Sequence, residues 1–251
     1  NNLLKPSDGR PVTVPTQDMV LGSYYLTLDK DGEPGEGKVF RNMDEAMMAY
    51  DAHDITLHSK IRVRRTVDFN GTPVTGLVDT TMGRMIFNRP IPQDLGYVDR
   101  STPEEALKFE VDFLVGKKQL GKIIDKCITK HGFTVSAGVL DAIKDLGYHY
   151  STRGSLTVAI ADMTVPQKKY ELIGDTEKEI IKIDRQYRRG LITNDERYRL
   201  SVQAWEKTTN DVTDALRESM DRYNPIFMMA DSGARGSMAQ IRQLAGMRGL
   251  M

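Results

Sequence analysis

The C-terminal stretch from Met228 to Met251 carries the residue types best suited to chemistry. A guanidinium presents a fixed fork of donors that matches phosphate oxygens, and glycine lets a backbone approach a ligand closely. Arg235 lies between Gly233 and Gly236, so it is the first candidate for a phosphate contact. No acidic residue follows Asp231, and the stretch also contains Arg242, Arg248, Gly246 and Gly249.

A short helix is expected to position this stretch. Ser237 and Gln240 have the spacing of a capping box, and the residues after them place apolar side chains at helical spacing. A frayed basic tail would explain the charge equally well, but it needs neither a cap nor an apolar face. The apolar positions of the expected helix are Ile241, Leu244 and Ala245.

Two long amphipathic segments precede this stretch and predict an antiparallel coiled-coil hairpin over about residues 165–222. Thr164 and Gln167 are expected to cap the first helix, and Thr193 with Glu196 the second. Gly190 marks the turn between them. The apolar or small positions alternate in steps of three and four; they are Ile173, Thr176, Ile180, Ile183 and Tyr187, then Tyr198, Val202, Trp205, Thr209, Val212 and Leu216.

The tip of this hairpin combines charged and apolar side chains at the far end of a rigid arm. Most charged side chains on such a hairpin are solvated, but the tip differs from the rest of the hairpin in having apolar groups among its charges. The tip residues are Arg188, Arg189, Leu191, Asn194, Asp195 and Glu196.

The N-terminal part of the chain predicts a mixed helix and strand domain. Thr16 is expected to cap a helix whose first polar residues are Gln17 and Asp18. Alternation from Ile55 to Arg65 predicts a strand with one buried face, and Asn70-Gly71 predicts a tight hairpin turn after it. The basic exposed face of that strand fits a guarded sheet edge or a nucleic-acid contact.

Helices dominate the next hundred residues of the predicted domain. Thr102, Pro103 and Glu105 predict a helix start, with the helix running to Gly116. Further helices are expected from Lys117 to His131 and from Val135 to Gly147, and a short apolar strand from Leu156 to Met163. With a helical hairpin and a short C-terminal helical segment after this domain, the fold class is α+β.

Composition excludes several classes of protein. The chain has 251 residues with 35 basic and 35 acidic side chains, so any nucleic-acid contact must come from a local patch. No apolar run reaches the roughly 20 residues of a membrane helix. Cys127, the single cysteine, is expected to be a buried hydrophobe in a cytoplasmic protein. The four histidines show no spacing that suits a metal.

Two stretches of this sequence resemble the largest catalytic (beta-prime) subunit of bacterial multisubunit RNA polymerase. They are Val14-Pro15-Thr16-Gln17-Asp18 and the uninterrupted run from Met228 to Met251. The first residue of the chain is not a methionine and begins no signal-peptide pattern, so we expect a fragment of such a subunit. Asp68 offers one carboxylate where the family's metal loop has three, and it is expected to be a hairpin residue.

The resemblance implies a function for each part of the chain. Residues 1–162 would form the pore domain, a wall of the secondary channel through which nucleotides enter and backtracked RNA leaves. Residues 163–251 would form the funnel domain, whose rim-helix hairpin docks channel-binding transcription factors at its tip. Arg235, Gln17 and Arg242 would contact a nucleoside triphosphate or the RNA 3′ end, with Arg242 equally explained as a salt-bridge partner.

The resemblance also implies what this fragment lacks. The parent enzyme would perform magnesium-dependent nucleotidyl transfer, whereas the fragment would hold no catalytic residue, no metal ligand and no cofactor, and would be inactive alone. Its partners would be the other polymerase subunits, with DNA reached only through the parent enzyme, in the bacterial cytoplasm. The alternative is a free-standing coiled-coil adaptor that binds a protein partner.

Overall fold

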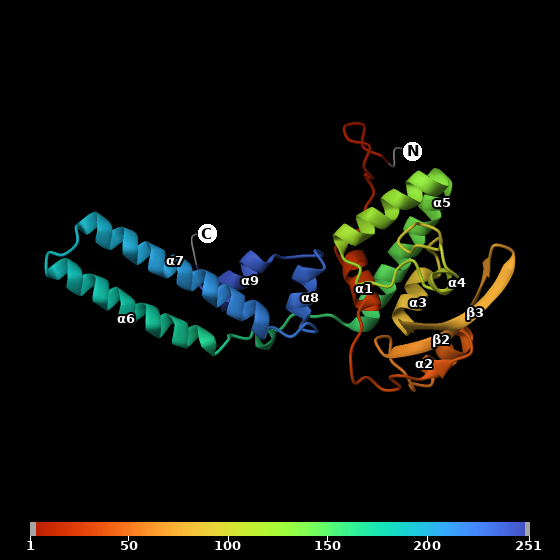
Figure 1. The fold of residues 1–251 in the computed structure, drawn as a ribbon, viewed down its shortest axis with the longest axis horizontal. Helices are drawn as coiled ribbons and strands as arrows, with labels where there is room; N and C mark the ends of the chain where they lie inside the picture. The colour runs from red at the N-terminus through yellow and green to blue at the C-terminus, as the bar shows by residue number, and fades with distance from the viewer. Residues whose placement is uncertain (1–3, 249–251) are drawn as a thin grey trace. The chain divides into compact units, whose positions relative to one another are not determined.

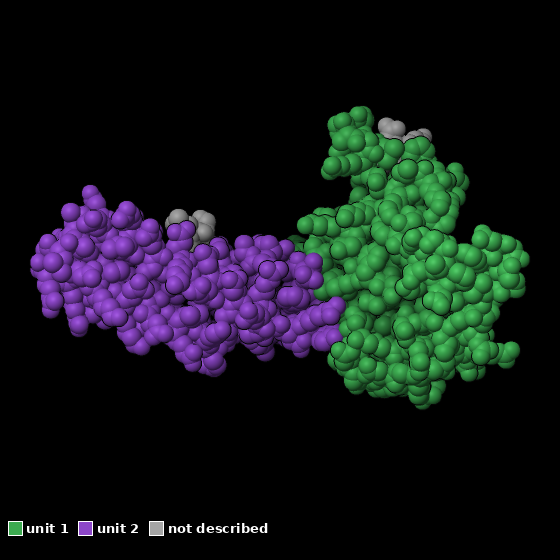
Figure 2. All heavy atoms as spheres, viewed as in Figure 1, with its two compact units in different colours: residues 1–156, 232–235 green, residues 157–231, 236–251 purple. Residues whose placement is uncertain are grey.

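The computed structural model describes residues 4–248, and these divide into two compact units. The first unit contains residues 1–156 and 232–235, and the second contains residues 157–231 and 236–251 (Figure 2). The expected α+β class is confirmed, because helices are joined in the first unit by a small sheet (Figure 1).

Helix α1 (Asp18–Thr27) is the centre of the first unit. It is buried on almost every side, with Val20, Tyr24 and Leu26 at 0–1% exposure. A helix that is apolar all round must be enclosed by other elements. Helix α5 (Lys117–Gly154) covers one side of α1, and α3 (Met82–Asn88) covers another.

The start of α1 differs from the sequence expectation. Thr16 does not cap the helix; the N-cap residue is Gln17, and its side chain makes no capping hydrogen bond. Its backbone carbonyl instead accepts from Val20 N and Leu21 N, both at 3.0 Å. The Gln17 backbone lies at φ 48° and ψ −119°, a conformation that side-chain-bearing residues rarely adopt.

The described strands form one sheet in the order β1-β2-β3. β1 (Val39–Phe40) pairs in parallel with β2 (Lys60–Phe69), which pairs with β3 (Thr72–Thr81) in an antiparallel hairpin. Asn70 and Gly71 both have positive φ, which confirms the predicted turn. Asp68 is a hairpin residue as expected, since its carboxylate accepts from Gly71 N at 2.8 Å.

The strand predicted from Ile55 begins later, at Lys60. Ile55 and Leu57 are buried in a turn that precedes it, and His58 is buried rather than exposed. Ser59 explains the difference, because its hydroxyl binds Thr56 N and Pro34 O and folds this segment locally. Helix α2 (Met43–Asp51) lies between β1 and β2 in the chain, and Asn42 caps it by accepting from Glu45 N at 2.8 Å.

The helix expected from Thr102 to Gly116 is much shorter. α4 spans only Pro103–Ala106, although Thr102 caps it as predicted. Side chains that are distant in sequence bind the backbone of the following segment and keep it irregular. Arg65 donates to Leu107 O and Lys108 O at 2.7 and 2.9 Å, and Asn88 bonds both the amide and the carbonyl of Val111.

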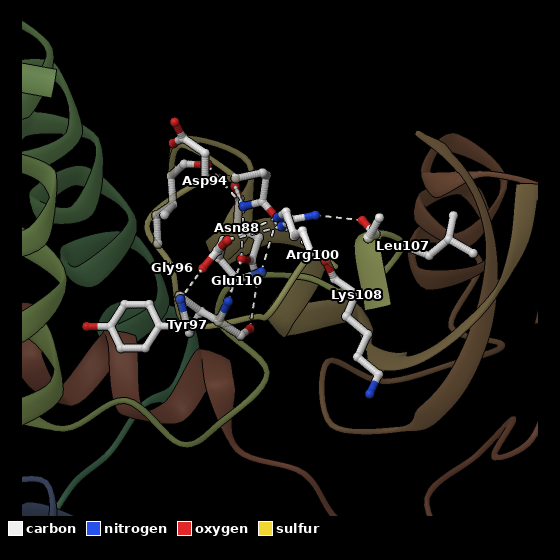
Figure 3. Close-up of polar contacts among 12 residues, drawn as sticks. Asn88, Asp94, Gly96, Tyr97, Arg100, Leu107, Lys108 and Glu110 are labelled. Carbon is white, nitrogen blue, oxygen red and sulfur yellow. Dashed lines mark hydrogen bonds and ion pairs between the residues drawn. The ribbon is translucent and has the colours of Figure 1, made fainter. Parts of the chain in front are cut away.

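The buried carboxylate of Glu110 also holds this region in place. Its side chain is fully buried and accepts from Tyr97 N at 2.8 Å and from the Arg100 guanidinium at 3.1 Å (Figure 3). Arg100 also donates to Ala106 O at 2.6 Å. A buried carboxylate needs such complete pairing to offset its desolvation, so these bonds fix the loop between α3 and α5.

Helix α5 combines the two helices predicted on either side of Gly132. Gly132 has φ 75° and ψ −173°, so the helix axis changes direction there, and the second part continues to Gly154 instead of Gly147. Cys127 is fully buried in the first part, as expected. The apolar strand expected from Leu156 to Met163 does not form; this segment holds a 3-10 turn, η1 (Ile160–Asp162), and Ile160 is 96% exposed.

The second unit contains the predicted helical hairpin. α6 (Lys168–Arg188) and α7 (Asn194–Ser219) pack against each other and are joined by a turn at Gly190, whose φ is 72°. α6 begins after Gln167, and neither Thr164 nor Gln167 provides a side-chain cap. α8 (Pro225–Asp231) and α9 (Met238–Ala245) complete the described helices.

The buried face of α7 differs from the predicted seam in its first half. Tyr198 and Val202 are 71% and 45% exposed, whereas Thr208 is buried and its hydroxyl lies 2.5 Å from that of Thr176. This contact between two threonine side chains places Thr208 on the face of α7 that packs against α6. The second half of the seam, at Val212 and Leu216, is buried as predicted.

The contact between α1 and α5 gives a testable prediction. A Cβ added to Gly22 would lie 1.9 Å from the Gly147 carbonyl oxygen, so Gly22→Ala should reduce the free energy of unfolding by about 1–3 kcal/mol through overpacking. The measurement is urea unfolding followed by far-UV circular dichroism.

Two controls make this prediction specific. Gly138 lies in α5, and a Cβ added there would face open space, so Gly138→Ala should stabilise by up to about 1 kcal/mol through helix propensity. Trp205, the single tryptophan, belongs to the second unit, and its fluorescence transition should not move in either variant. Equal stability of the two alanine variants would contradict the proposed contact.

Candidate functional site

The segment from Ser232 to Arg235 belongs to the first unit and is fixed to the beginning of α5. Lys117 N donates to Ser232 O at 2.8 Å, and Ala234 packs against the core of the first unit. The first amides of a helix lack partners within the helix, and Ser232 satisfies one of them. This bond places the backbone that carries Arg235.

Arg235 is exposed at the end of this anchored segment. The flanking glycines, Gly233 and Gly236, have φ of 73° and 81° and turn the chain sharply on each side. No acidic side chain in the described part of the chain forms an ion pair with Arg235. Its guanidinium is therefore accessible on a backbone that is held in place, which is what a preorganised phosphate contact requires.

Helix α9 follows this segment and belongs to the second unit. The predicted capping box is confirmed: Ser237 Oγ accepts from Gln240 N, and Gln240 Oε1 accepts from Ser237 N at 3.1 Å. Ile241 and Ala245 are buried together with Leu216 and Met220. The expectation for Leu244 is wrong, because it lies on the other side of the helix and is 71% exposed.

Arg242 is half-buried on α9. Its Nε is buried and has no hydrogen-bond partner among residues 4–248, and no ion pair within this range involves it. The described part of the chain therefore lacks the salt bridge that would have accounted for Arg242 without a ligand. Gly249, which we noted in the sequence, lies outside the described residues.

Gln17 is exposed at the beginning of α1, as the sequence suggested. Its unusual backbone conformation is maintained by the two amide hydrogen bonds to its carbonyl. Such outliers cluster at functional sites, which favours a role for Gln17. Within residues 4–248, no hydrogen bond or ion pair joins Gln17 to Arg235.

The hairpin tip contains two groups of residues with different partners. Arg188, Asn194 and Glu196 are engaged within the hairpin: Arg188 pairs with Asp184 at 2.9 Å, and Asn194 accepts from Arg197 at 2.9 Å. Arg189, Leu191 and Asp195 are exposed, with Leu191 at 68%. All six tip residues are exposed, and these three are the ones whose side chains form no hydrogen bond or ion pair within residues 4–248.

Glu196 and Thr193 form the predicted capping box. Hydrogen bonds from the Thr193 backbone amide and hydroxyl hold the pKa of Glu196 below its usual value. The Glu196 carboxylate is therefore committed to the helix start. Any substitution of Glu196 changes the cap as well as the surface charge.

Arg197 is a tip residue that could not be singled out from the sequence. It lies on α7 and contacts α6, with its guanidinium 3.5 Å from Asp184 Oδ1 and 4.6 Å from the centre of the Tyr187 ring. The role of Arg197 can be recognised only once the two helices are paired, because its partners Asp184 and Tyr187 lie on α6, before the turn. Arg197 therefore links the two helices at the tip, with its side chain still 39% exposed.

The described residues do not provide a magnesium site. Magnesium is held by several carboxylate oxygens, and no group of three or more histidine, cysteine, aspartate or glutamate side chains lies together within residues 4–248. Asp68 is used by the hairpin turn. The donor set of this part of the chain does not fit the metal. No described helix is long and apolar enough to span a membrane.

Comparison with known proteins agrees with the resemblance seen in the sequence. The family described as RNA polymerase Rpb1, domain 3, matches residues 2–163, and the family described as RNA polymerase Rpb1, domain 4, matches residues 192–251.

Curated relatives match the chain over its whole length. The DNA-directed RNA polymerase subunit beta' of Clostridium novyi is 61% identical over 251 residues, and that of Clostridium acetobutylicum is 59% identical. In both cases the match covers 100% of this chain and 21% of the relative. The chain thus spans about a fifth of the length of these relatives, and it belongs to the family of the RNA polymerase beta' subunit.

Proposed function

We propose that this chain forms part of a bacterial DNA-directed RNA polymerase and takes part in DNA-templated RNA synthesis. The observation that carries the proposal is the match of all 251 residues, at about 60% identity, to subunits of that name. A free-standing coiled-coil adaptor would explain the hairpin alone. It would not explain why both families match on either side of the first hairpin helix.

Within this enzyme, we propose that the first unit lines the channel through which nucleotides enter and backtracked RNA leaves. Arg235 would contact a phosphate of the incoming nucleoside triphosphate or of the RNA 3′ end, because a guanidinium binds phosphate oxygens in a bidentate manner. Gln17 and Arg242 are the further candidate contacts. The anchored backbone of Ser232 would keep Arg235 oriented before the ligand arrives.

The chemistry of nucleotide addition would belong to other parts of the enzyme. Magnesium in the parent enzyme would neutralise the triphosphate and activate the RNA 3′ hydroxyl, and the described residues hold no donor set for it. This chain would bind and orient phosphate, and it would be inactive by itself. Its partners would be the other polymerase subunits in the bacterial cytoplasm, with DNA bound only through the assembled enzyme.

The second unit would dock transcription factors that act through the channel. The support is the exposure of Arg189, Leu191 and Asp195 at a turn that Gly190, the Thr193 cap and Arg197 hold rigid. An exposed leucine among charges of both signs is suited to a polar partner surface with one apolar pocket.

The Arg235 assignment predicts a change in nucleotide affinity. In the reassembled polymerase, Arg235→Ala should raise the KM for nucleoside triphosphates about tenfold, because a charge-assisted hydrogen bond is worth about 1.5–3 kcal/mol. Alternatively the same variant should slow cleavage of backtracked RNA if the contact is with the 3′ end. Both reactions are measured by gel-based transcription assays.

Two control variants refine this test. Arg235→Lys keeps the charge without the fork and should give an intermediate defect. Arg217→Ala, which removes an exposed arginine from α7, should leave both reactions unchanged. Wild-type kinetics of Arg235→Ala in both assays would refute the phosphate contact.

The docking assignment predicts a loss of factor binding that does not come from loss of structure. Asp195→Lys reverses an exposed charge and leaves the Thr193 and Glu196 cap intact, so affinity for a transcript-cleavage factor should fall at least tenfold. Glu206→Lys makes the same reversal in the middle of α7, on its exposed surface, and should have no effect. Unchanged pulldown of the factor by the Asp195→Lys enzyme would remove the docking role.

A further inference from the structure

A basic pocket lies between the N-terminal arm and the first part of α5. Its wall carries four cationic side chains, Lys5 and Arg10 from the arm and Lys118 and Lys122 from the helix, and its volume is about 370 Å³. The arm and α5 both belong to the first unit, and Figure 1 shows the arm at the N-terminal end of the chain. We call the cavity that these four side chains line the basic pocket.

The local structure of each element brings these charges together. The arm folds back on itself through a bridge between Leu4 and Pro11, and Lys5 N donates to Arg10 O at 2.8 Å. Lys118 and Lys122 are one helical turn apart, so they share a face of α5. The neighbouring residues Leu120, Ile123 and Ile124 are buried, which fixes the rotation of the helix and directs the two lysines outward.

The charges of the basic pocket are poorly compensated. Within residues 4–248, no ion pair involves Lys5, Lys118 or Lys122, and the guanidinium of Arg10 approaches Asp8 only to 3.8 Å. Asp125 is the single acidic residue of the wall. In a chain of formal net charge +0, this is a local excess of positive charge that a bound anion would relieve.

Several other surface lysines differ in this respect, because acidic side chains of the same chain neutralise them, whereas Lys168, Lys182 and Lys207 are also exposed without an ion pair within residues 4–248. A second charged pocket, around Lys60 and Arg84, contains cations that are already bound to Asp29, Asp31 and Asp112. It therefore offers no net charge to a ligand. The paired lysines elsewhere are Lys30, Lys108, Lys130, Lys144 and Lys178.

We infer that the basic pocket binds the phosphodiester backbone of a nucleic acid without reading its sequence. Lysines act as point charges toward phosphate oxygens, and the remaining wall, with Pro11, Val14 and the unsubstituted backbone of Gly121, offers apolar contact to a sugar. None of the wall residues is aromatic, so bases have no surface on which to stack. The basic pocket does not include Arg235. The proposal for this pocket therefore does not depend on the phosphate contact proposed for Arg235.

The test measures the affinity of the 251-residue chain for fluorescein-labelled oligonucleotides of random sequence by anisotropy at several salt concentrations. The double variant Lys118→Gln/Lys122→Gln should bind at least tenfold more weakly than wild type at low salt. Removing two phosphate contacts should also make the dependence on salt weaker: the slope of log K (the association constant) against log salt concentration should become less negative by about 1.4 for a single strand. Oligonucleotides of different sequence should bind equally.

Control variants separate the basic pocket from the rest of the charged surface. Lys207→Gln removes an exposed lysine of α7 that lies outside the pocket, and it should bind as wild type does. Circular dichroism checks that the double variant remains folded, and Lys5→Gln/Arg10→Gln, which leaves α5 unchanged, should reproduce the defect.

Three results would overturn the inference. The first is wild-type affinity in the double variant, and the second is an equal loss in Lys207→Gln. The third is inorganic tripolyphosphate binding at the pocket when oligonucleotides do not bind, because the site would then serve free polyphosphate instead of a nucleic-acid backbone.

Discussion

The position of Arg235 depends on one backbone hydrogen bond, from Lys117 N to Ser232 O. This bond joins a segment near the C-terminus to the first turn of α5, more than a hundred residues earlier in the chain. α5 is itself held by α1, where Gly22 and Gly147 allow the two backbones to touch. The candidate phosphate contact is thus built on a closely packed part of the first unit, although Arg235 itself is exposed.

The two units are stabilised by different kinds of packing. The first encloses an apolar helix and uses buried polar side chains such as Glu110 and Asn88 to replace regular structure in the loops around it. The second has a narrow buried seam between α6 and α7, and its exposed faces carry apolar side chains such as Ile181, Tyr198 and Leu244 among the polar ones. Its rigidity at the tip comes from short-range interactions, namely the Thr193 cap and the contacts of Arg197, which leave Asp195 and Leu191 accessible.

Most features that depend on neighbouring residues could be predicted from the sequence, whereas those that depend on distant partners could not. The caps at Thr102, Thr193 and Ser237 need only a partner three residues away, and all three are present, although the caps expected at Thr16 and at Thr164 with Gln167 do not form. The helix expected after Thr102 failed because Arg65, Asn88 and Arg100 bind the backbone of that segment.

The candidate site shows the same division. The predicted buried face of α7 is wrong in its first half because Thr208 contacts Thr176 of α6. The spacing of apolar residues alone does not specify which residues of the two helices face each other. Arg235 could be singled out from its residue type and its flanking glycines. The hydrogen bond from Lys117 N to Ser232 O that holds this segment could not be predicted from the sequence. The basic pocket was also missed, since Lys5 and Lys118 meet only in the folded chain.

The central claim is that the segment carrying Arg235 faces the triphosphate of an incoming nucleotide. The most direct measurement is photo-crosslinking in the assembled polymerase with a nucleotide that carries an aryl azide on its γ-phosphate, followed by mass spectrometry of the digested subunit. We expect adducts within residues 232–242 that unlabelled nucleotide suppresses by competition. Adducts found only in other parts of the polymerase, with none in this segment, would contradict the claim.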